Sequence, residues 1–461
     1  MISSPRAAAA CGAFAAGALV PEAARRAART AWLDTIGVAL AGAVEPAARK
    51  VQAICEAAGG HPICQVLGST QRTGAMPAAL ANGTAAHALD FDDMCFVSMA
   101  HPSAPLVAAS LAAGELAGAS GAALLDAYVI GFEIEAVLGR AVNPSHYTRG
   151  WHCTSTLGSV GATAAAARVL SLDSEAVARS ISIGASFAAG LKQNFGTMVK
   201  PLHAGMAARN GVLAALLAAE GFSASDAALD GPQGFVAVTS EEPLRLAGAL
   251  QALGARWEIL ETGVAIKLYP SCAATHPILD VLLDLRREHG FSGEDVDAIE
   301  VGVDRVTPTV LIHPDPRTAM EAKFSLQYCA AAAAAHGRVD IDTFEEPQLQ
   351  EAPVRRLLPR VRMVVDDRLG RDASLTQARV AVRLTNGRVL AGEASGARGY
   401  PANPPSPREL EAKFRACALR ALEPNAVEAA LDALHGMESL PDVRPFAARL
   451  AGRSAEAAVR A

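Results

Sequence analysis

The feature that most limits the possible folds is a helical pattern over residues 1–262. In residues 22–41, apolar Trp32, Ile36 and Leu40 recur at the spacing of one helix face. Short Gly, Pro and Asn breaks separate this stretch from further helical runs at 106–118, 122–139, 159–170 and 207–220. Because small side chains let helix axes approach closely, the high alanine content suits such packing. Residues 1–262 are therefore predicted to form the first part of an all-helical domain.

The pattern changes after residue 262. Ile299, Val301 and Val303 alternate with Glu300 and Gly302, which is typical of a half-buried strand. A second strand is expected at 361–365, and a hairpin is expected from strands at 379–384 and 389–392, joined by a type I′ turn at Asn386-Gly387. Residues 263–404 are predicted to form a smaller α+β domain.

Helix returns in residues 405–461. Ser406 and Glu409 are spaced as a capping box, and Pro407 between them occupies the first helical position. We expect this C-terminal part to rejoin the first helical domain. The predicted fold class is mainly α, with one large helical domain built from both chain ends and a smaller α+β domain.

Composition excludes several classes of protein. The 461 residues carry a formal net charge of −6, whereas a nucleic-acid-binding domain needs a basic surface. The long uncharged stretches contain His, Pro, Ser and Thr in place of the Leu and Ile of a membrane span, so no span is predicted. The eight cysteines form no CxxC pair or His/Cys cluster. They are expected to be reduced thiols of a cytoplasmic protein without a metal site.

The segment 87–93 carries a concentration of ionisable groups. It contains His87 and the carboxylates of Asp90, Asp92 and Asp93, and His101 follows eight residues later. Carboxylates this close repel one another unless they are solvated, paired or bound to a cation. Two interpretations remain open, an acidic helix end in solvent and a functional site in an apolar neighbourhood.

A second segment, 147–156, runs from Tyr147 through His152 into Thr154 and Ser155 before a Gly/Ala-rich helix. Free N–H groups at a helix N-terminus favour an anion, and the two hydroxyls could assist them. This segment is either an anion-binding site or a helix cap with an incidental histidine.

Lysine is scarce, since only six of the 41 basic residues are lysines. In a chain that uses arginine almost everywhere, a lysine can mark a place that needs a compact ammonium group. Lys200, followed by Pro201 and His203, and Lys267, followed by Pro270, lie in Gly/Pro-broken segments typical of sites.

The sequence lacks the motifs of several other enzyme classes. The chain has no GxSxG elbow, no GxxxxGK[ST] loop and no HExxH helix. The letters Asp90-Phe91-Asp92-Asp93 also fit a class II terpene cyclase, but carbocations need aromatic faces and the chain is only 5% aromatic. Histidine, lysine, tyrosine and carboxylate groups without a cofactor motif favour acid–base chemistry on an anionic substrate. A non-catalytic binding protein is the remaining alternative.

Taken together, these motifs resemble the MmgE/PrpD family, which includes 2-methylcitrate dehydratase, cis-aconitate decarboxylase and iminodisuccinate epimerase. The resemblance runs along the whole chain, and its landmarks in order are residues 33–38, 90–93 with 101–103, 150–152, 194–197, 200–205, Lys267 and 324–328.

The resemblance implies a homodimer in which a small α+β lid covers a cofactor-free cleft on the large helical domain. It implies catalytic roles for Asp90, His101, His152 and Tyr328, to which we add Tyr147, with His101 or His152 as the base. It implies that Lys200 and Lys267 bind the carboxylates of a small di- or tricarboxylic acid, and we add His203 and Thr154 as substrate-binding residues.

Proton abstraction next to a carboxylate would then lead to dehydration or decarboxylation, as in a lyase. The same abstraction on an iminodisuccinate-like substrate would make the chain an epimerase instead. Dehydratases and decarboxylases of the family usually place Thr and Trp after the aspartate block, whereas this chain has Met94 and Cys95. The spacing from Asp90 to His101 resembles the epimerase branch more closely.

Overall fold

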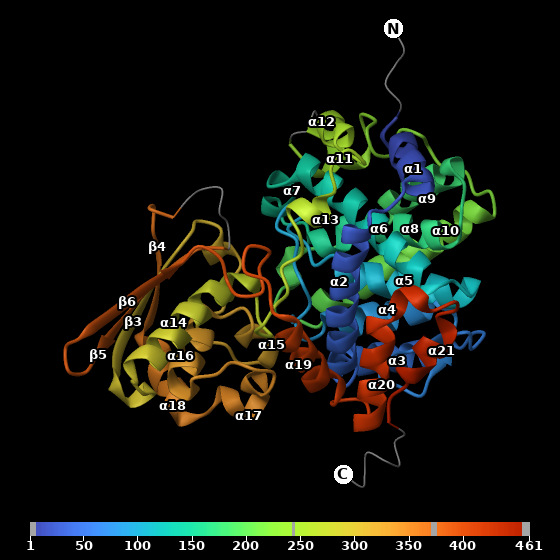
Figure 1. Ribbon diagram of the computed structural model, residues 1–461. Coiled ribbons are helices and arrows are strands. Elements are labelled where there is room, and N and C mark those ends of the chain that lie inside the picture. The colour runs from blue at the N-terminus through green and yellow to red at the C-terminus, as the bar shows by residue number, and fades with distance from the viewer. Residues whose placement is uncertain (1–5, 242–244, 370–375, 454–461) are drawn as a thin grey trace.

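The computed structural model describes residues 6–241, 245–369 and 376–453. The described residues are mostly helical, with one four-stranded and one two-stranded sheet, which confirms the predicted fold class at this level. Figure 1 shows two bodies side by side: a large helical body that contains the first and last described helices, and a smaller body that contains the four-stranded sheet.

The helices of the large body come first in the chain. They are α1 (Ala7–Gly17), α2 (Glu22–Gly42), α3 (Pro46–Ala58), α4 (Ala75–His87), α5 (Ser103–Ala117), α6 (Gly121–Val142), α7 (Ser145–Thr148), α8 (Cys153–Val169), α9 (Ser174–Ser186), α10 (Val199–Ala219), α11 (Phe235–Thr239), α12 (Arg245–Gln251) and α13 (Glu258–Glu261). This body is not purely helical as predicted, because β1 (Cys64–Gln65) and β2 (Arg72–Thr73) pair antiparallel within it. Gly68, at φ +65°, allows the turn that joins them.

The smaller body contains α14 (His276–His289), β3 (Val296–Val303), α15 (Ala319–Ala322), α16 (Leu326–His336), α17 (Glu346–Leu349), α18 (Ala352–Leu357), β4 (Val361–Val365), β5 (Ala378–Leu384) and β6 (Val389–Ala394). The strand order is β4-β3-β5-β6, with β3 parallel to β4 and antiparallel to β5. The inward side chains of β3, among them Ile299 and Val301, are buried, while Glu300 is exposed, as the alternation predicted. In Figure 1, α14 and α16 lie in front of the strands of this sheet.

The hairpin between β5 and β6 differs from its predicted turn. The Leu384 N–H donates to the Arg388 carbonyl, so the loop has three residues rather than two. Only Gly387, at φ +84°, has a positive φ angle within this loop. This is the pattern of a three-residue loop with a left-handed glycine, not of a type I′ turn.

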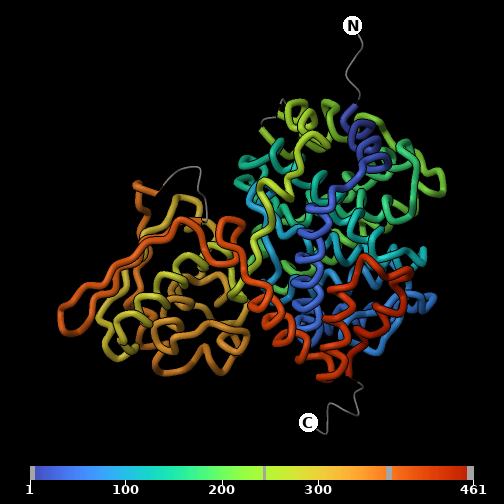
Figure 2. Tube along the Cα trace, viewed as in Figure 1, coloured from blue at the N-terminus to red at the C-terminus, as the bar shows by residue number. Residues whose placement is uncertain are grey.

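The chain then returns to the large body through α19 (Pro407–Ala418), α20 (Pro424–His435) and α21 (Arg444–Arg449). α19 begins with the predicted capping box of Ser406 and Glu409. Both α19 and α20 pack against α2, so the C-terminal helices lie beside the N-terminal ones, as the red and blue segments of Figure 2 show. Short 3-10 turns complete the fold at Lys192–Asn194, Ala273–Thr275, Gly293–Asp295, Thr307–Thr309, Asp342–Phe344, Leu358–Arg360 and Met437–Ser439.

α10 is long and apolar enough by composition to cross a membrane, and the bent pair of α1 and α2 passes the same test together. More than half of the apolar window of α10 is buried against its neighbours, and this burial is typical of the core helix of a globular body.

Close contact between α4 and α10 holds the centre of the large body together. A Cβ atom added at Gly205 of α10 would lie 2.2 Å from Thr84 Oγ1 and 2.3 Å from the Leu80 carbonyl oxygen, both on α4. Glycine at this position therefore sets the distance between the helix that ends in His87 and the helix that carries Lys200.

We expect Gly205→Ala to destabilise the protein, because the two helices would have to separate. Overpacking of a core commonly costs about 1–3 kcal/mol, which exceeds the gain in helix propensity of alanine over glycine. Urea unfolding followed by circular dichroism measures the change. Gly17→Ala is the matched control, since nothing lies within 4 Å of the added Cβ. An unfolding free energy of Gly205→Ala equal to that of the control would contradict the proposed close contact.

Candidate active site

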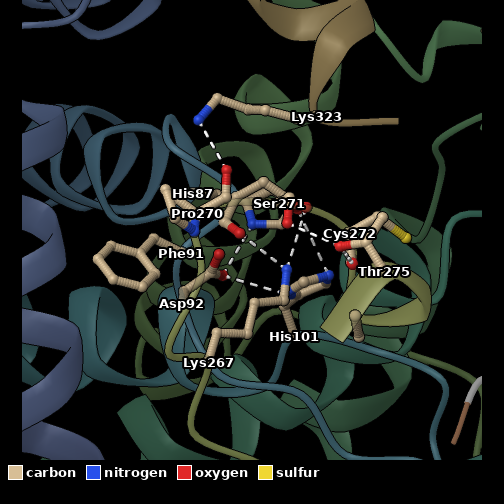
Figure 3. A network of polar contacts seen from close by, with 12 residues as sticks. His87, Phe91, Asp92, His101, Lys267, Pro270, Ser271, Cys272, Thr275 and Lys323 are labelled. Atoms are coloured by element: carbon tan, nitrogen blue, oxygen red, sulfur yellow. Dashed lines mark hydrogen bonds and ion pairs between the residues drawn. The ribbon is translucent and has the colours of Figure 1, made fainter. Parts of the chain in front are cut away.

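A buried group of ionisable side chains lies where the two bodies meet. Asp90 and Asp92 follow the end of α4, and His101 lies just before α5. Lys200 belongs to the first turn of α10. Lys267 comes from residues 262–275, the crossover that connects the large body to the smaller one. Figure 3 shows His87, Asp92, His101 and Lys267 converging there, with Pro270 to Thr275 of the crossover beside them. Segments far apart in the sequence thus form one polar cluster.

Asp90 lies between two lysines. Lys200 Nζ is 2.5 Å from its Oδ1, and Lys267 Nζ is 3.0 Å from its Oδ2 and 2.8 Å from its main-chain oxygen. Burial alone would raise the pKa of Asp90, but the two ammonium groups hold that pKa below its ordinary value. Asp90 is therefore ionised.

His87 links Lys200 to Asp92. Its Nδ1 is 2.8 Å from Asp92 Oδ2, and its Nε2 is 2.8 Å from Lys200 Nζ. Burial, with the lysine nearby, lowers the pKa of His87 to about 3. The ring is thus neutral, so its Nδ1–H donates to the carboxylate and its Nε2 accepts from the ammonium group.

The three neighbouring carboxylates avoid mutual repulsion in three different ways. Asp90 pairs with lysines, whereas Asp92 is buried and keeps a pKa well below its ordinary value because His87 and His101 face it. Asp93 accepts hydrogen bonds from Ser103, and burial, with Asp34 and Asp92 nearby, raises its pKa well above the ordinary value. The aspartate block is therefore a buried cluster and not an acidic helix end in solvent.

His101 is held by its surroundings on two sides. Its Nδ1 is 3.5 Å from Asp92 Oδ2 and its Nε2 is 3.8 Å from Asp90 Oδ1, while its main-chain N–H donates to Thr154 Oγ1 at 3.0 Å. Burial, with Lys267 and Lys200 nearby, lowers its pKa. His101 is consequently a neutral ring placed between two carboxylates.

His152 occupies the N-cap position of α8, where its side chain makes no hydrogen bond to the helix. Its Nδ1 is 3.0 Å from Nδ1 of His203, while its Nε2 is buried without a hydrogen-bond partner. Burial, with Lys200 and His87 nearby, lowers the pKa of His152 well below its ordinary value. Burial also lowers the pKa of His203 to about 4. Nε2 of His152 is therefore free of internal hydrogen bonds, as is the buried Nδ1 of His101, and either atom can exchange a proton with a ligand.

A small, partly enclosed cavity adjoins these groups, with a volume of about 20 Å³. Space of this size holds about one water molecule. The cavity is lined by Asp90, Met94, Met99, His101, Tyr147, His152, Phe195, Lys200, Cys272, Ala273, Val310 and Phe324. Asp90 and Met99 both have φ +52°, an uncommon conformation for residues other than glycine. Such strained residues often lie at functional sites.

The cluster also offers four residues, His87, Asp90, Asp92 and His101, whose ligand atoms lie within 4.8 Å of one another. A divalent cation fits them poorly, because Lys200 and Lys267 already place two positive charges on Asp90. Both ring nitrogens of His87 are also already engaged, by Asp92 and Lys200.

Comparison with known protein families identifies this architecture. Residues 14–246 match the MmgE/PrpD N-terminal domain, and residues 269–437 match the MmgE/PrpD C-terminal domain. The chain belongs to the MmgE/PrpD family.

Several MmgE/PrpD relatives are similar over most of their length. The human cis-aconitate decarboxylase is 29% identical over 386 residues, which cover 82% of this chain and 79% of the relative. A cis-aconitate decarboxylase-like protein of Aspergillus oryzae is 26% identical over 444 residues, or 91% of each chain. The cis-aconitate decarboxylase of Aspergillus terreus is 24% identical over 438 residues, which cover 90% of this chain and 89% of the relative.

The structure divides the site residues expected from the family resemblance into two groups. Some of them line the cavity directly: Asp90, His101, Tyr147, His152 and Lys200. The second group lies outside the cavity wall, and three of its members contact a residue of the wall: Lys267 contacts Asp90, His203 contacts His152, and Thr154 contacts His101.

Tyr328 is not brought to the cavity at all. Its hydroxyl donates to the Thr343 carbonyl oxygen at 2.5 Å, and its ring packs near Phe344 inside the smaller body. Similarly, the Ser155 hydroxyl donates to the His203 carbonyl oxygen, so it is not a free anion ligand. His152 lies at the N-terminus of α8, as segment 147–156 predicted, whereas Thr154 and Ser155 are hydrogen-bonded within the protein.

The sequence patterns did not indicate roles for several residues of this site. His87 was part of the aspartate segment, and its position three residues before Asp90 could have indicated its role. Phe195 and Phe324 lie 5.5 Å and 5.2 Å from Lys200 Nζ, where aromatic faces favour a cation. Both phenylalanines belong to motifs of the resemblance, but their approach to Lys200 depends on long-range packing that no local pattern reveals.

Proposed function

We propose that the protein is a cofactor-independent lyase that removes CO₂ from a small carboxylic acid in the cavity at Lys200 and His152. The cis-aconitate decarboxylases among its relatives support this reaction class. The observation that carries the proposal is the joint presence, around one cavity, of a buried ammonium group and a buried imidazole nitrogen without a partner.

We propose that the large helical body is the main domain and that the smaller body is a lid. The cavity between them has room for about one water molecule, so a carboxylic acid can enter only if the bodies separate. Val310 and Phe324 come from the smaller body and face His101 and His152 of the large one. Closure would bring these apolar side chains over the substrate and exclude water from the reacting atoms.

Lys200 would bind the substrate carboxylate. An ammonium group has three N–H donors, and Asp90 and His87 take two of them. The third remains for a ligand in the cavity that Lys200 lines. Lys267 would act through Asp90, by keeping that carboxylate ionised and in place beside Lys200.

His152 would supply the proton. Its pKa is low in the free protein, but the negative charge of a bound carboxylate favours the imidazolium form. Once the bond to CO₂ breaks, its electron pair stays on the carbon, and that carbon takes the Nε2 proton of His152. The ring returns to its neutral form, so each turnover consumes one proton from solvent and releases one CO₂.

Tyr147 and His101 would complete the polar part of the cavity lining. Burial, with Cys272 and other groups nearby, raises the pKa of Tyr147 well above its ordinary value, so its phenol keeps its proton and can donate to a carboxylate. His101 lies between Asp90 and Asp92, and we assign it a positioning role rather than the proton transfer.

The test is to incubate the purified protein with small unsaturated di- and tricarboxylic acids and to measure released CO₂ by a coupled assay. We expect CO₂ release from at least one acid. Loss of water without CO₂ would make the protein a dehydratase, and binding without any product would make it a binding protein. The comparisons give no support to the epimerase alternative.

A further inference from the structure

The cavity is lined by side chains of two chemical kinds. The first kind consists of the ionisable and polar groups Asp90, His101, Tyr147, His152 and Lys200. The second kind, which we call the hydrocarbon wall, consists of Met94, Met99, Phe195, Val310 and Phe324, and Cys272 and Ala273 complete the lining. No side chain of the hydrocarbon wall carries an N–H or O–H donor. Cys272 does not supply a charge either, because burial raises the pKa of its thiol to about 11.

The charges of the lining residues and of the buried groups in contact with them are already balanced. Asp90 and Asp92 contribute two negative charges, and Lys200 and Lys267 contribute two positive charges. The histidines add no charge in the free protein, because burial lowers the pKa of His87, His101 and His152. One bound carboxylate can use the third donor of Lys200, and a second can use Tyr147 or an imidazole.

A third carboxylate would find no cation among the residues that line the cavity, but only the tyrosine or imidazole that the second carboxylate leaves. Lys323 is the next buried lysine, but it is absent from the cavity wall, and its ammonium group donates to the Pro270 carbonyl oxygen over the ring of Phe344 (Figure 3 shows the contact with Pro270). A carboxylate pressed against the hydrocarbon wall would therefore lose its hydration without compensation, which is strongly unfavourable.

The backbone that carries the two methionines is fixed. Met94 and Ala265 exchange two main-chain hydrogen bonds, of 2.9 and 2.8 Å, and Cys95 and Ala100 exchange another pair. The side chain of Asn143 also donates to the Ser98 carbonyl oxygen at 2.8 Å. The loop between Met94 and Ala100 is thus tied at its ends and its middle, so the wall is preorganised for an apolar group.

We infer that the substrate carries at most two carboxylates and presents a hydrocarbon arm to the wall formed by Met94, Met99, Phe195, Val310 and Phe324. This inference rests on the proposed function, since it places the substrate carboxylates at Lys200. It distinguishes the protein from an enzyme that acts on a tricarboxylic acid, because the substrate would carry an alkyl group where a tricarboxylic acid carries its third carboxylate.

The test compares two unreactive ligands that differ only at this arm. Tricarballylate has three carboxylates, and 2-ethylsuccinate has a methyl group where tricarballylate has its third carboxylate. We expect isothermal titration calorimetry with the wild-type protein to show at least about tenfold tighter binding of 2-ethylsuccinate. Equal or tighter binding of tricarballylate would overturn the inference and leave the carboxylate site intact. Binding of neither ligand at millimolar concentration would overturn the carboxylate site of the proposed function itself.

A charge placed on the wall should reverse this preference. Met99 is half-buried, so the stem of a lysine can follow the path of the methionine while its ammonium group reaches the cavity. We expect Met99→Lys to bind tricarballylate more tightly and 2-ethylsuccinate more weakly than the wild-type protein does. Met99→Leu, which keeps a hydrocarbon side chain, should retain the wild-type preference. An unchanged preference in a folded Met99→Lys would contradict the assigned position of the arm.

Discussion

Replacement of Lys200 by methionine is expected to lower kcat/KM by about 10³-fold or more. The ammonium group is the cation that the cavity offers to a carboxylate and to the charge that develops as CO₂ leaves. Removal of one preorganised donor to such a charge commonly lowers kcat by 10²–10³-fold, and here ground-state binding is lost as well. Steady-state kinetics of CO₂ release measures the effect.

The same substitution should also lower stability, because Asp90 would keep only one of its two buried ammonium partners. Loss of one partner from a buried ion pair commonly costs about 3–5 kcal/mol. Circular dichroism must therefore show that the variant is folded at the assay temperature. Lys50→Met is the matched control, since Lys50 is exposed on α3. A folded Lys200→Met variant with the activity of the control would remove Lys200 from the mechanism.

Replacement of His152 by glutamine is expected to lower kcat by about 10²–10⁴-fold, the usual contribution of a positioned acid or base, with a smaller change in KM. Since the pKa of His152 lies well below its ordinary value, the ring must take up a proton when substrate binds. We therefore expect kcat/KM of the wild-type protein to fall about tenfold per pH unit as pH rises from 6 to 8. His289→Gln, at an exposed position on α14, should leave both parameters unchanged.

His203→Asp checks the same assignment through the partner of His152. A carboxylate near Nδ1 would raise the pKa of His152 by favouring its charged form. The decline of kcat/KM should then begin at a higher pH than in the wild-type protein. A His203→Asp profile identical to that of the wild-type protein would contradict the coupling of the two rings.

Local sequence patterns predicted the elements of the fold well where they are periodic. α2 ends at Gly42, one residue beyond its predicted end, and β4 has its predicted bounds. The hairpin turn was wrong because Asn-Gly also fits a three-residue loop, and the choice depends on strand register rather than on the dipeptide. The β1–β2 pair was missed because two-residue strands have no period to detect.

The residue types of the candidate site could be predicted from the sequence. Which of these residues line the cavity could not. Asp90 and Lys200 could be selected from charge in an apolar setting, and the structure brings them within 2.5 Å. Packing between α4, α8, α10 and the segment that connects the two bodies decides whether a residue lines the cavity or contacts a residue that lines it. For this reason Lys267 and His203 were expected at the substrate, whereas they contact Asp90 and His152 instead.

The proposed reaction depends most on the transfer of one proton from His152 to the carbon that loses CO₂. Turnover in heavy water, followed by mass spectrometry and NMR of the product, tests this transfer directly. We expect one deuterium per CO₂ at that carbon, on a single stereochemical face. A product that carries no solvent deuterium, or that carries it equally on both faces, would contradict proton transfer from His152.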